Sequence, residues 1–176
     1  MKKIFFLSFL LAFICVGCIQ KQFLSSLKPY CGNSYEGKTI FPVDETDPFH
    51  GKTLKIHFTG CSRNEYRIPF QVGDDRSRTW ILTADNKTLT LKHDHRHADS
   101  SPDSVTMYGG VSRDPKNALN QLFPADPYTA SLIPAAATNE WNLVLSNDGR
   151  TLSYILKRHN KLRFHADFDL SKPLNN

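Results

Sequence analysis

Residues 151–170 read TLSYILKRHNKLRFHADFDL and carry the clearest secondary-structure signal of the chain. Apolar and polar residues alternate along its second half, with Leu162, Phe164, Ala166, Phe168 and Leu170 on one face and Arg163, His165, Asp167 and Asp169 on the other. A period of two is typical of a half-buried β-strand. The stretch therefore predicts strands with an apolar inner face and a polar outer face.

The same alternation recurs along the chain, for example at Leu54, Ile56 and Phe58. It predicts nine strands, at 37–42, 53–60, 65–72, 78–84, 88–97, 104–108, 140–146, 151–158 and 161–170. Short links with turn chemistry, such as Asn147-Asp148-Gly149, make neighbouring strands antiparallel. We expect an all-β fold, an antiparallel up-and-down β-barrel or strongly curved sheet of eight to ten strands, because closure leaves no exposed edge. A two-sheet sandwich is the alternative.

Three local features depart from the strand pattern. Asp114 before Pro115 and Asp126 before Pro127 are typical helix starts, and they predict two short helices within 114–134. Pro69 cannot donate to a strand ladder, so it indicates a sheet edge or a bulge. Gly109-Gly110 is expected to end the strand at 104–108, where it permits a close approach or a sharp turn.

The N-terminal residues have the features of an export signal. Lys2-Lys3 precedes an apolar run over 4–17 that is too short to span a bilayer, as in a secretory signal. Cys15-Val16-Gly17-Cys18 resembles the lipobox of bacterial lipoproteins, although Cys15 stands where the pattern usually has Leu. The resemblance implies that 1–17 is a signal peptide, that Cys18 is lipidated, and that Ile19 favours the outer membrane. An ordinary signal peptide cut nearby is the alternative.

Beyond Cys18, residues 18–30 have little periodicity and are expected to be a tether, which leaves 31–176 as one barrel-like domain. This part holds two cysteines, Cys31 and Cys61, in an oxidising compartment. They favour a disulfide, and two separate buried thiols are the alternative.

The amino-acid composition excludes several classes of protein. The 176 residues are 40% apolar and 22% charged, which rules out disordered and polytopic membrane proteins. The net charge of +5 falls to about +3 without the signal peptide, and no block of like charges is present. A nucleic-acid partner is therefore not expected. The sequence contains no GxSxG, GxGxxG, P-loop or HExxH motif.

The densest group of chemically useful residues is Lys92-His93-Asp94-His95-Arg96-His97. On a strand, the three histidines continue the inward face. Two of them could bind zinc with a third ligand from His57, Asp99 or Asp103. They could also line the mouth of the barrel without a metal, or act in acid–base chemistry or anion binding.

A second group, Asp74-Asp75-Arg76-Ser77-Arg78, places two arginines on one turn. Arg76 and Arg78 could bind a carboxylate or a phosphate. The turn could instead be solvated or held together by Asp–Arg pairs.

Several motifs occur together in this chain: Arg67-Ile68-Pro69-Phe70, Asp75-Arg76-Ser77-Arg78-Thr79-Trp80, Lys92 to His97, Thr106-Met107-Tyr108-Gly109-Gly110 and Phe123-Pro124-Ala125-Asp126. In combination they resemble a family of uncharacterised secreted bacterial proteins over most of 29–173. The resemblance implies a secreted single-domain protein and nothing catalytic. A looser similarity to lipocalin-like barrels concerns architecture only.

These observations favour a non-enzymatic envelope lipoprotein that binds a small anionic ligand at the mouth of the barrel. The residues expected to bind it are Arg76, Arg78, His93, His95 and His97. The other expected partner is the lipid bilayer, through the acyl anchor, and no cofactor is predicted. Two alternatives stay open: a zinc-dependent hydrolase that uses two of the histidines His93, His95 and His97 with a carboxylate such as Asp99 or Asp103, and a structural or interaction module.

Overall fold

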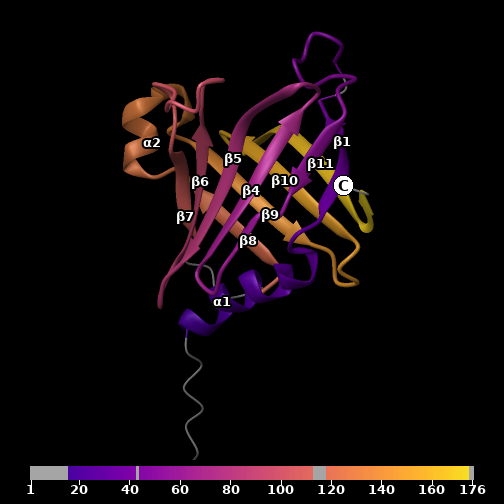
Figure 1. Ribbon diagram of the computed structural model, residues 1–176. Helices are drawn as coiled ribbons and strands as arrows, with labels where there is room; N and C mark the ends of the chain where they lie inside the picture. Colours follow the sequence, from indigo (N-terminus) through magenta and orange to yellow (C-terminus); the bar gives the residue numbers. More distant parts are fainter. Residues whose placement is uncertain (1–15, 43, 113–117, 175–176) are drawn as a thin grey trace, which may run out of the picture.

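A computed structural model describes residues 16–42, 44–112 and 118–174. The chain forms one eleven-stranded antiparallel sheet that nearly closes into a barrel (Figure 1), with the strands in the order β7-β6-β5-β4-β2-β1-β11-β10-β9-β8 and β3 beside β4. The strands are β1 Ser34–Phe41, β2 Leu54–His57, β3 Gly60–Cys61, β4 Glu65–Val72, β5 Asp75–Ala84, β6 Leu89–His95, β7 Tyr108–Ser112, β8 Asn120–Pro124, β9 Asn139–Leu145, β10 Thr151–Arg158 and β11 Lys161–Leu174. This arrangement confirms the predicted barrel, and the described residues form no second sheet as a sandwich would require.

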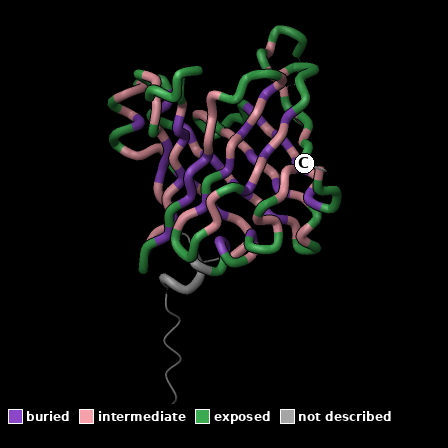
Figure 2. The backbone as a smooth tube through the Cα atoms, viewed as in Figure 1, coloured by how far each residue is buried: buried purple, intermediate pink, exposed green. Residues whose placement is uncertain are grey.

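The alternation read from the sequence sets the inside and the outside of the barrel. Buried positions recur at every second residue along most strands, and exposed residues concentrate in the connections (Figure 2). In β11, Phe164, Ala166, Phe168 and Leu170 are all buried, as the opening stretch predicts. Leu162, predicted on the same inner face, is exposed instead, because the register of β11 shifts between Leu162 and Phe164. The inward side chains belong to one continuous apolar core. Burial of apolar area is the dominant stabilising contribution to such a fold.

The barrel closes where β7 meets β8. Gly110 of β7 forms an isolated antiparallel bridge with Ala125, and the Ser112 hydroxyl donates to Oε1 of Gln121 at 2.9 Å. A Cβ atom on Gly110 would lie 1.9 Å from the carbonyl oxygen of Pro124. The glycine therefore permits a backbone approach that no other residue would allow. Contrary to expectation, Gly109 and Gly110 lie within β7 instead of ending an earlier strand.

The N-terminal segment differs from the expected tether. Residues Val16–Leu27 form helix α1, and a 3₁₀ turn follows at Lys28–Tyr30. Phe23, Leu24 and Leu27 of α1 are at most 1% exposed and join the barrel core. The helix lies across one end of the barrel (Figure 1). Its buried residues recur at i, i+1 and i+4, so they lie on one face of the helix. This face is buried only because it packs against the open end of the barrel.

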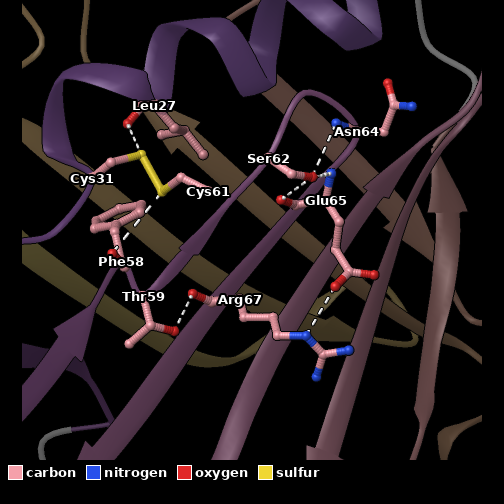
Figure 3. Close-up of a disulfide and its surroundings, with 9 residues drawn as sticks. All are labelled: Leu27, Cys31, Phe58, Thr59, Cys61, Ser62, Asn64, Glu65 and Arg67. Atoms are coloured by element: carbon pink, nitrogen blue, oxygen red, sulfur yellow. Dashed lines mark hydrogen bonds and ion pairs between the residues drawn. A yellow bond between two sulfur atoms is a disulfide. The ribbon is translucent and has the colours of Figure 1, made fainter.

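The disulfide between Cys31 and Cys61 is confirmed, with the two Cα atoms 6.1 Å apart. Figure 3 shows it beside the C-terminal end of α1, where it links the segment after the helix to β3. It thus fixes the N-terminal segment against the sheet at the end that α1 covers.

The helical predictions for 114–134 are right in one half and wrong in the other. Helix α2 spans Pro127–Leu132, and the side chain of Asp126 accepts from the Thr129 amide as an N-cap. A 3₁₀ turn follows at Pro134–Ala136. The first expected helix began at Asp114, outside the described residues, and its second half is strand β8. Pairing with β9 outweighs the local helix signal there, because it buries Phe123 completely.

Strand boundaries near the histidines also shift. Strand β6 ends at His95, two residues earlier than predicted, and the expected strand at 104–108 is a connection that leads into β7 at Tyr108. Pro69 lies inside β4, at the point where its neighbour on one side changes from β2 to β3. This break in pairing is the irregularity that the proline indicated. No helix among the described residues is both long and apolar enough to cross a bilayer.

Candidate ligand-binding cavity

A cavity of about 350 Å³ opens inside the barrel, at the end that carries α2 and the connection between β1 and β2. Helix α1 covers the opposite end (Figure 1). Seventeen residues line the cavity: Asp47, Phe49, Phe70, Arg78, Trp80, His93, His95, Tyr108, Ile133, Ala136, Asn139, Trp141, Tyr154, Leu156, Arg158, Arg163 and Phe164. The volume is at the small end of the range for protein sites that bind one organic molecule.

Seven of the seventeen lining residues are phenylalanine, tryptophan or tyrosine. The ring centroids of Trp80 and Tyr154 lie 4.5 Å apart in a stacked arrangement, and Phe49 contacts Phe164 with centroids 4.7 Å apart. Phe70 lies 4.9 Å from Trp80, also between ring centroids. These rings come from five different segments of the chain, and the closure of the barrel brings them together. Such a wall offers flat apolar surfaces to a bound molecule.

His93 lies at the floor of the cavity, where two hydrogen bonds fix its ring and burial keeps it uncharged. Its Nδ1 lies 3.2 Å from the carbonyl oxygen of Tyr108, and its Nε2 lies 2.8 Å from the hydroxyl of Tyr154. A carbonyl only accepts, so Nδ1 carries the proton and Nε2 accepts from Tyr154. Burial lowers the pKa of His93 from its usual 6.5 to about 3. Burial likewise raises the pKa of Tyr154 well above 10. The floor is therefore polar but neutral.

His95 lies nearer the opening and is half-buried. Its Nε2 is 3.0 Å from the hydroxyl oxygen of Tyr108. Burial lowers the pKa of His95, and the positive charge of Arg78 lowers it further. Tyr108 thus contacts both histidines, one through its carbonyl and one through its hydroxyl.

Three arginines surround the opening, and we call Arg78, Arg158 and Arg163 the arginine rim. Arg78 pairs with Asp75, and its guanidinium lies over the Phe49 ring, 5.7 Å from the centroid. The rim is less buried than the floor, because Arg78 and Arg158 are partly exposed and Arg163 is exposed.

The position of Arg163 corrects an expectation. Simple alternation places it outside the barrel with His165 and Asp167. In the structure Leu156 pairs with Phe164 and Lys157 pairs with Leu162, so Arg163 is the extra residue of a β-bulge. A bulge redirects a side chain relative to the regular pleat. The irregularity therefore accounts for an arginine at the cavity where the sequence pattern predicts an outward residue.

The structure brings three of the five predicted ligand-binding residues together, namely Arg78, His93 and His95. Arg76 and His97 do not line the cavity, and both are exposed. His97 does not continue the inward face because β6 ends two residues before it.

The candidate metal ligands are dispersed. His57 faces away from the cavity and lies 2.6 Å from the Ser34 hydroxyl through Nδ1. Asp99 and Asp103 accept from backbone amides in their own loop. Across the described ranges, no three His, Cys, Asp or Glu side chains cluster as a metal site would require.

Sequence reasoning missed the aromatic partners Tyr108, Trp141 and Tyr154 and the rim residues Arg158 and Arg163. Tyr154 carried a signal, because it alternates with apolar neighbours in β10. Arg158 carried a weaker one, two positions beyond Leu156 on the same face. No protein-family model matches the chain, and no curated protein shows significant sequence similarity to it.

Proposed function

We propose that this protein is an exported envelope lipoprotein that binds one small anionic molecule in the barrel cavity and does not transform it. The observation that carries the proposal is an aromatic cavity of about 350 Å³ whose opening is surrounded by three arginines. A barrel of this size can enclose one small ligand. The arginine rim would attract and orient an anion by charge-assisted hydrogen bonds.

Binding is favoured over catalysis by the state of the polar groups inside. His93 uses both ring nitrogens in hydrogen bonds to Tyr108 and Tyr154, and its depressed pKa makes it a poor proton acceptor at neutral pH. Among the described residues that line the cavity there is no serine, threonine, cysteine or lysine to serve as a nucleophile, and the one carboxylate, from Asp47, accepts a hydrogen bond from the Phe49 amide.

The envelope location is supported by the address at the N-terminus, with lipidation at Cys18. Cys18 lies in α1, and α1 covers the end of the barrel away from the cavity (Figure 1). A lipid on Cys18 would therefore hold the closed end towards the membrane and leave the opening facing the aqueous compartment. This arrangement suits a ligand taken from solution.

Metabolic labelling with palmitate tests the anchor. The wild-type chain and the Cys15→Ser variant should incorporate label, and the Cys18→Ser variant should not. Label retained by Cys18→Ser would contradict lipidation at this position.

Intrinsic fluorescence tests the binding site, because the chain has only two tryptophans and both Trp80 and Trp141 line the cavity. Purified full-length protein in phosphatidylcholine vesicles should show a saturable change in tryptophan emission with 1-naphthoate, and its melting temperature should rise. If 1-naphthoate, octanoate and inorganic phosphate all fail to change the emission or the melting temperature, the proposal is overturned. Stoichiometric zinc that is lost in both His93→Ala and His95→Ala would overturn it in favour of a metal-dependent hydrolase.

A further inference from the structure

The charge of the cavity changes with depth. Its deepest polar groups, the His93 imidazole and the Tyr154 hydroxyl, are neutral near pH 7 and hydrogen-bonded to each other. Trp80 and Trp141, beside them, are at most 2% exposed. The permanent positive charges lie at the partly exposed opening. Thus an ionic group placed on the floor would lose its hydration without gaining a charged partner. An ionic group placed at the rim would keep part of its hydration and gain a charged partner.

The three rim arginines are not equivalent. The Asp75 carboxylate neutralises Arg78. Arg158 donates from Nε to Oδ1 of Asn139 at 2.7 Å, and its terminal nitrogens have no partner among the described residues. The Arg163 side chain has neither a hydrogen bond nor an ion pair within the described part of the chain. Unneutralised charge is therefore concentrated on the β10–β11 hairpin.

One carboxylate faces the same cavity, from Asp47. Its Oδ1 accepts from the amide of Phe49 at 2.8 Å and so holds the turn that positions this ring. Asp47 is not ion-paired with either hairpin arginine. Among the side chains that line the cavity, Asp47 against these two guanidinium groups leaves a net positive charge of about one, which matches a single anionic group. Asp44 borders an adjoining groove with Arg163 and does not line the cavity.

The wall favours a flat molecule. Phe49 and Phe70 are nearly parallel, with an interplanar angle of 5°, and Trp80 and Tyr154 are inclined by 21°. In both pairs one ring stacks on the other, so a ligand would meet the outer faces and edges of these rings, where planar aromatic or rigid apolar groups pack well. A small, strongly hydrated anion would leave most of this apolar surface without a partner.

We infer that the ligand class is a small planar apolar monoanion, with its ring system against the aromatic wall and its carboxylate against Arg163 and Arg158. The inference rests on the proposed function and specifies the chemistry of the same cavity. The planar guanidinium groups match a carboxylate in a way that a point charge does not. The specificity-determining residue is Arg163, which the bulge in β11 places at the opening and which lacks a partner in the described residues.

Three probes separate the two parts of the inference, and all are followed by tryptophan emission. 1-Naphthoate has a planar apolar body and one charge, 1-naphthamide has the same shape without the charge, and inorganic phosphate has charge without the apolar body. We expect naphthoate to bind at least about tenfold more tightly than either of the other two, since a charge-assisted hydrogen bond contributes enough for such a factor.

The Arg163→Gln variant should lose about tenfold in naphthoate affinity and keep its affinity for naphthamide. Arg76→Gln is the matched control, because it removes the same charge from an exposed arginine that does not line the cavity. It should change neither affinity. Phe49→Ala should weaken both naphthalene probes about equally.

Other outcomes overturn the inference in recognisable ways. Equal binding of naphthoate and naphthamide would refute the role of the arginines, and equal binding of phosphate and naphthoate would refute the apolar body. In both cases binding in the cavity would survive. An equal loss of naphthoate affinity in Arg76→Gln and Arg163→Gln would show that net charge alone matters. Failure of all probes would instead contradict the proposed function itself.

Discussion

Nε2 of His93 lies 2.8 Å from the hydroxyl oxygen of Tyr154, although the two residues are 61 positions apart in the chain. His93 belongs to β6 and Tyr154 to β10, which are not neighbours in the sheet. The hydrogen bond therefore crosses the interior of the barrel and joins two parts of its wall. It places a titratable group in the core, and the stability of the protein becomes linked to that group's protonation.

The first prediction concerns pH. Between pH 6.5 and about 3 the unfolded imidazole of His93 binds a proton that the folded one does not, because burial lowers its folded-state pKa to about 3. This contribution to stability is fully present above pH 6.5 and is lost as the pH falls towards 3, by up to about 1.4 kcal/mol per pH unit. His93→Gln should flatten the fall in melting temperature between pH 7 and pH 4. His97→Gln, at an exposed position, serves as the control, and parallel curves for wild type and His93→Gln would contradict the linkage.

The second prediction concerns the disulfide. The bond joins residues 30 positions apart, for which the chain-entropy model gives about 3–4 kcal/mol of stabilisation. The double variant Cys31→Ala/Cys61→Ala should unfold at correspondingly lower denaturant concentration, and reduction of the wild type should reproduce the effect. Denaturant titration measures both. Unreduced protein from an oxidising compartment should also resist alkylation at these two positions. Two alkylated thiols would disprove the bond.

The third prediction concerns the β7–β8 closure. Gly110→Ala introduces a methyl group 1.9 Å from the Pro124 carbonyl oxygen, so the strands must separate. We expect a loss of about 1–3 kcal/mol in the free energy of unfolding, the usual cost of overpacking. Gly60→Ala is a fitting comparison, since its methyl group would meet only the Arg67 side chain at 3.3 Å. A stability for Gly110→Ala equal to that of Gly60→Ala would mean that the closure is looser than described.

The fourth prediction concerns α1. Leu27 is completely buried, so Leu27→Ala should destabilise the protein by about 2–5 kcal/mol. Gln22→Ala changes an exposed residue of the same helix and should have little effect. Thermal unfolding compares the two variants. If Leu27→Ala unfolds like the wild type, residues 18–30 act as a tether after all.

Much of the barrel could be predicted because its signal is local. Strands β4, β10 and β11 follow the alternation of apolar and polar residues, and the N-cap of α2 follows from Asp126-Pro127. Strand β8 escaped detection because its five residues offer too few alternations to outweigh a helix-like beginning. The helix α1 escaped because its three buried residues have no partner until the sheet curves.

The cavity was predictable only in part. The inward phase of His93 and His95 follows from Leu89 and Leu91 on the same strand. His97 shares that phase in the sequence, but the strand ends before it. Nothing adjacent in the sequence indicates that Tyr108, Trp141 and Tyr154 would surround these histidines, since they come from three other strands.

The fold class and the inward side of each regular strand were therefore predictable, because they depend on residues within a few positions of one another. The cysteine pair was predictable because only two cysteines follow Cys18. Which side chains meet inside the barrel, and which end stays open, depends on strand pairing across the whole sheet. Arg163 shows the physical reason. Alternation within one strand carries no information about its register with the neighbouring strand. The bulge that places this arginine at the cavity arises only when β11 pairs with β10.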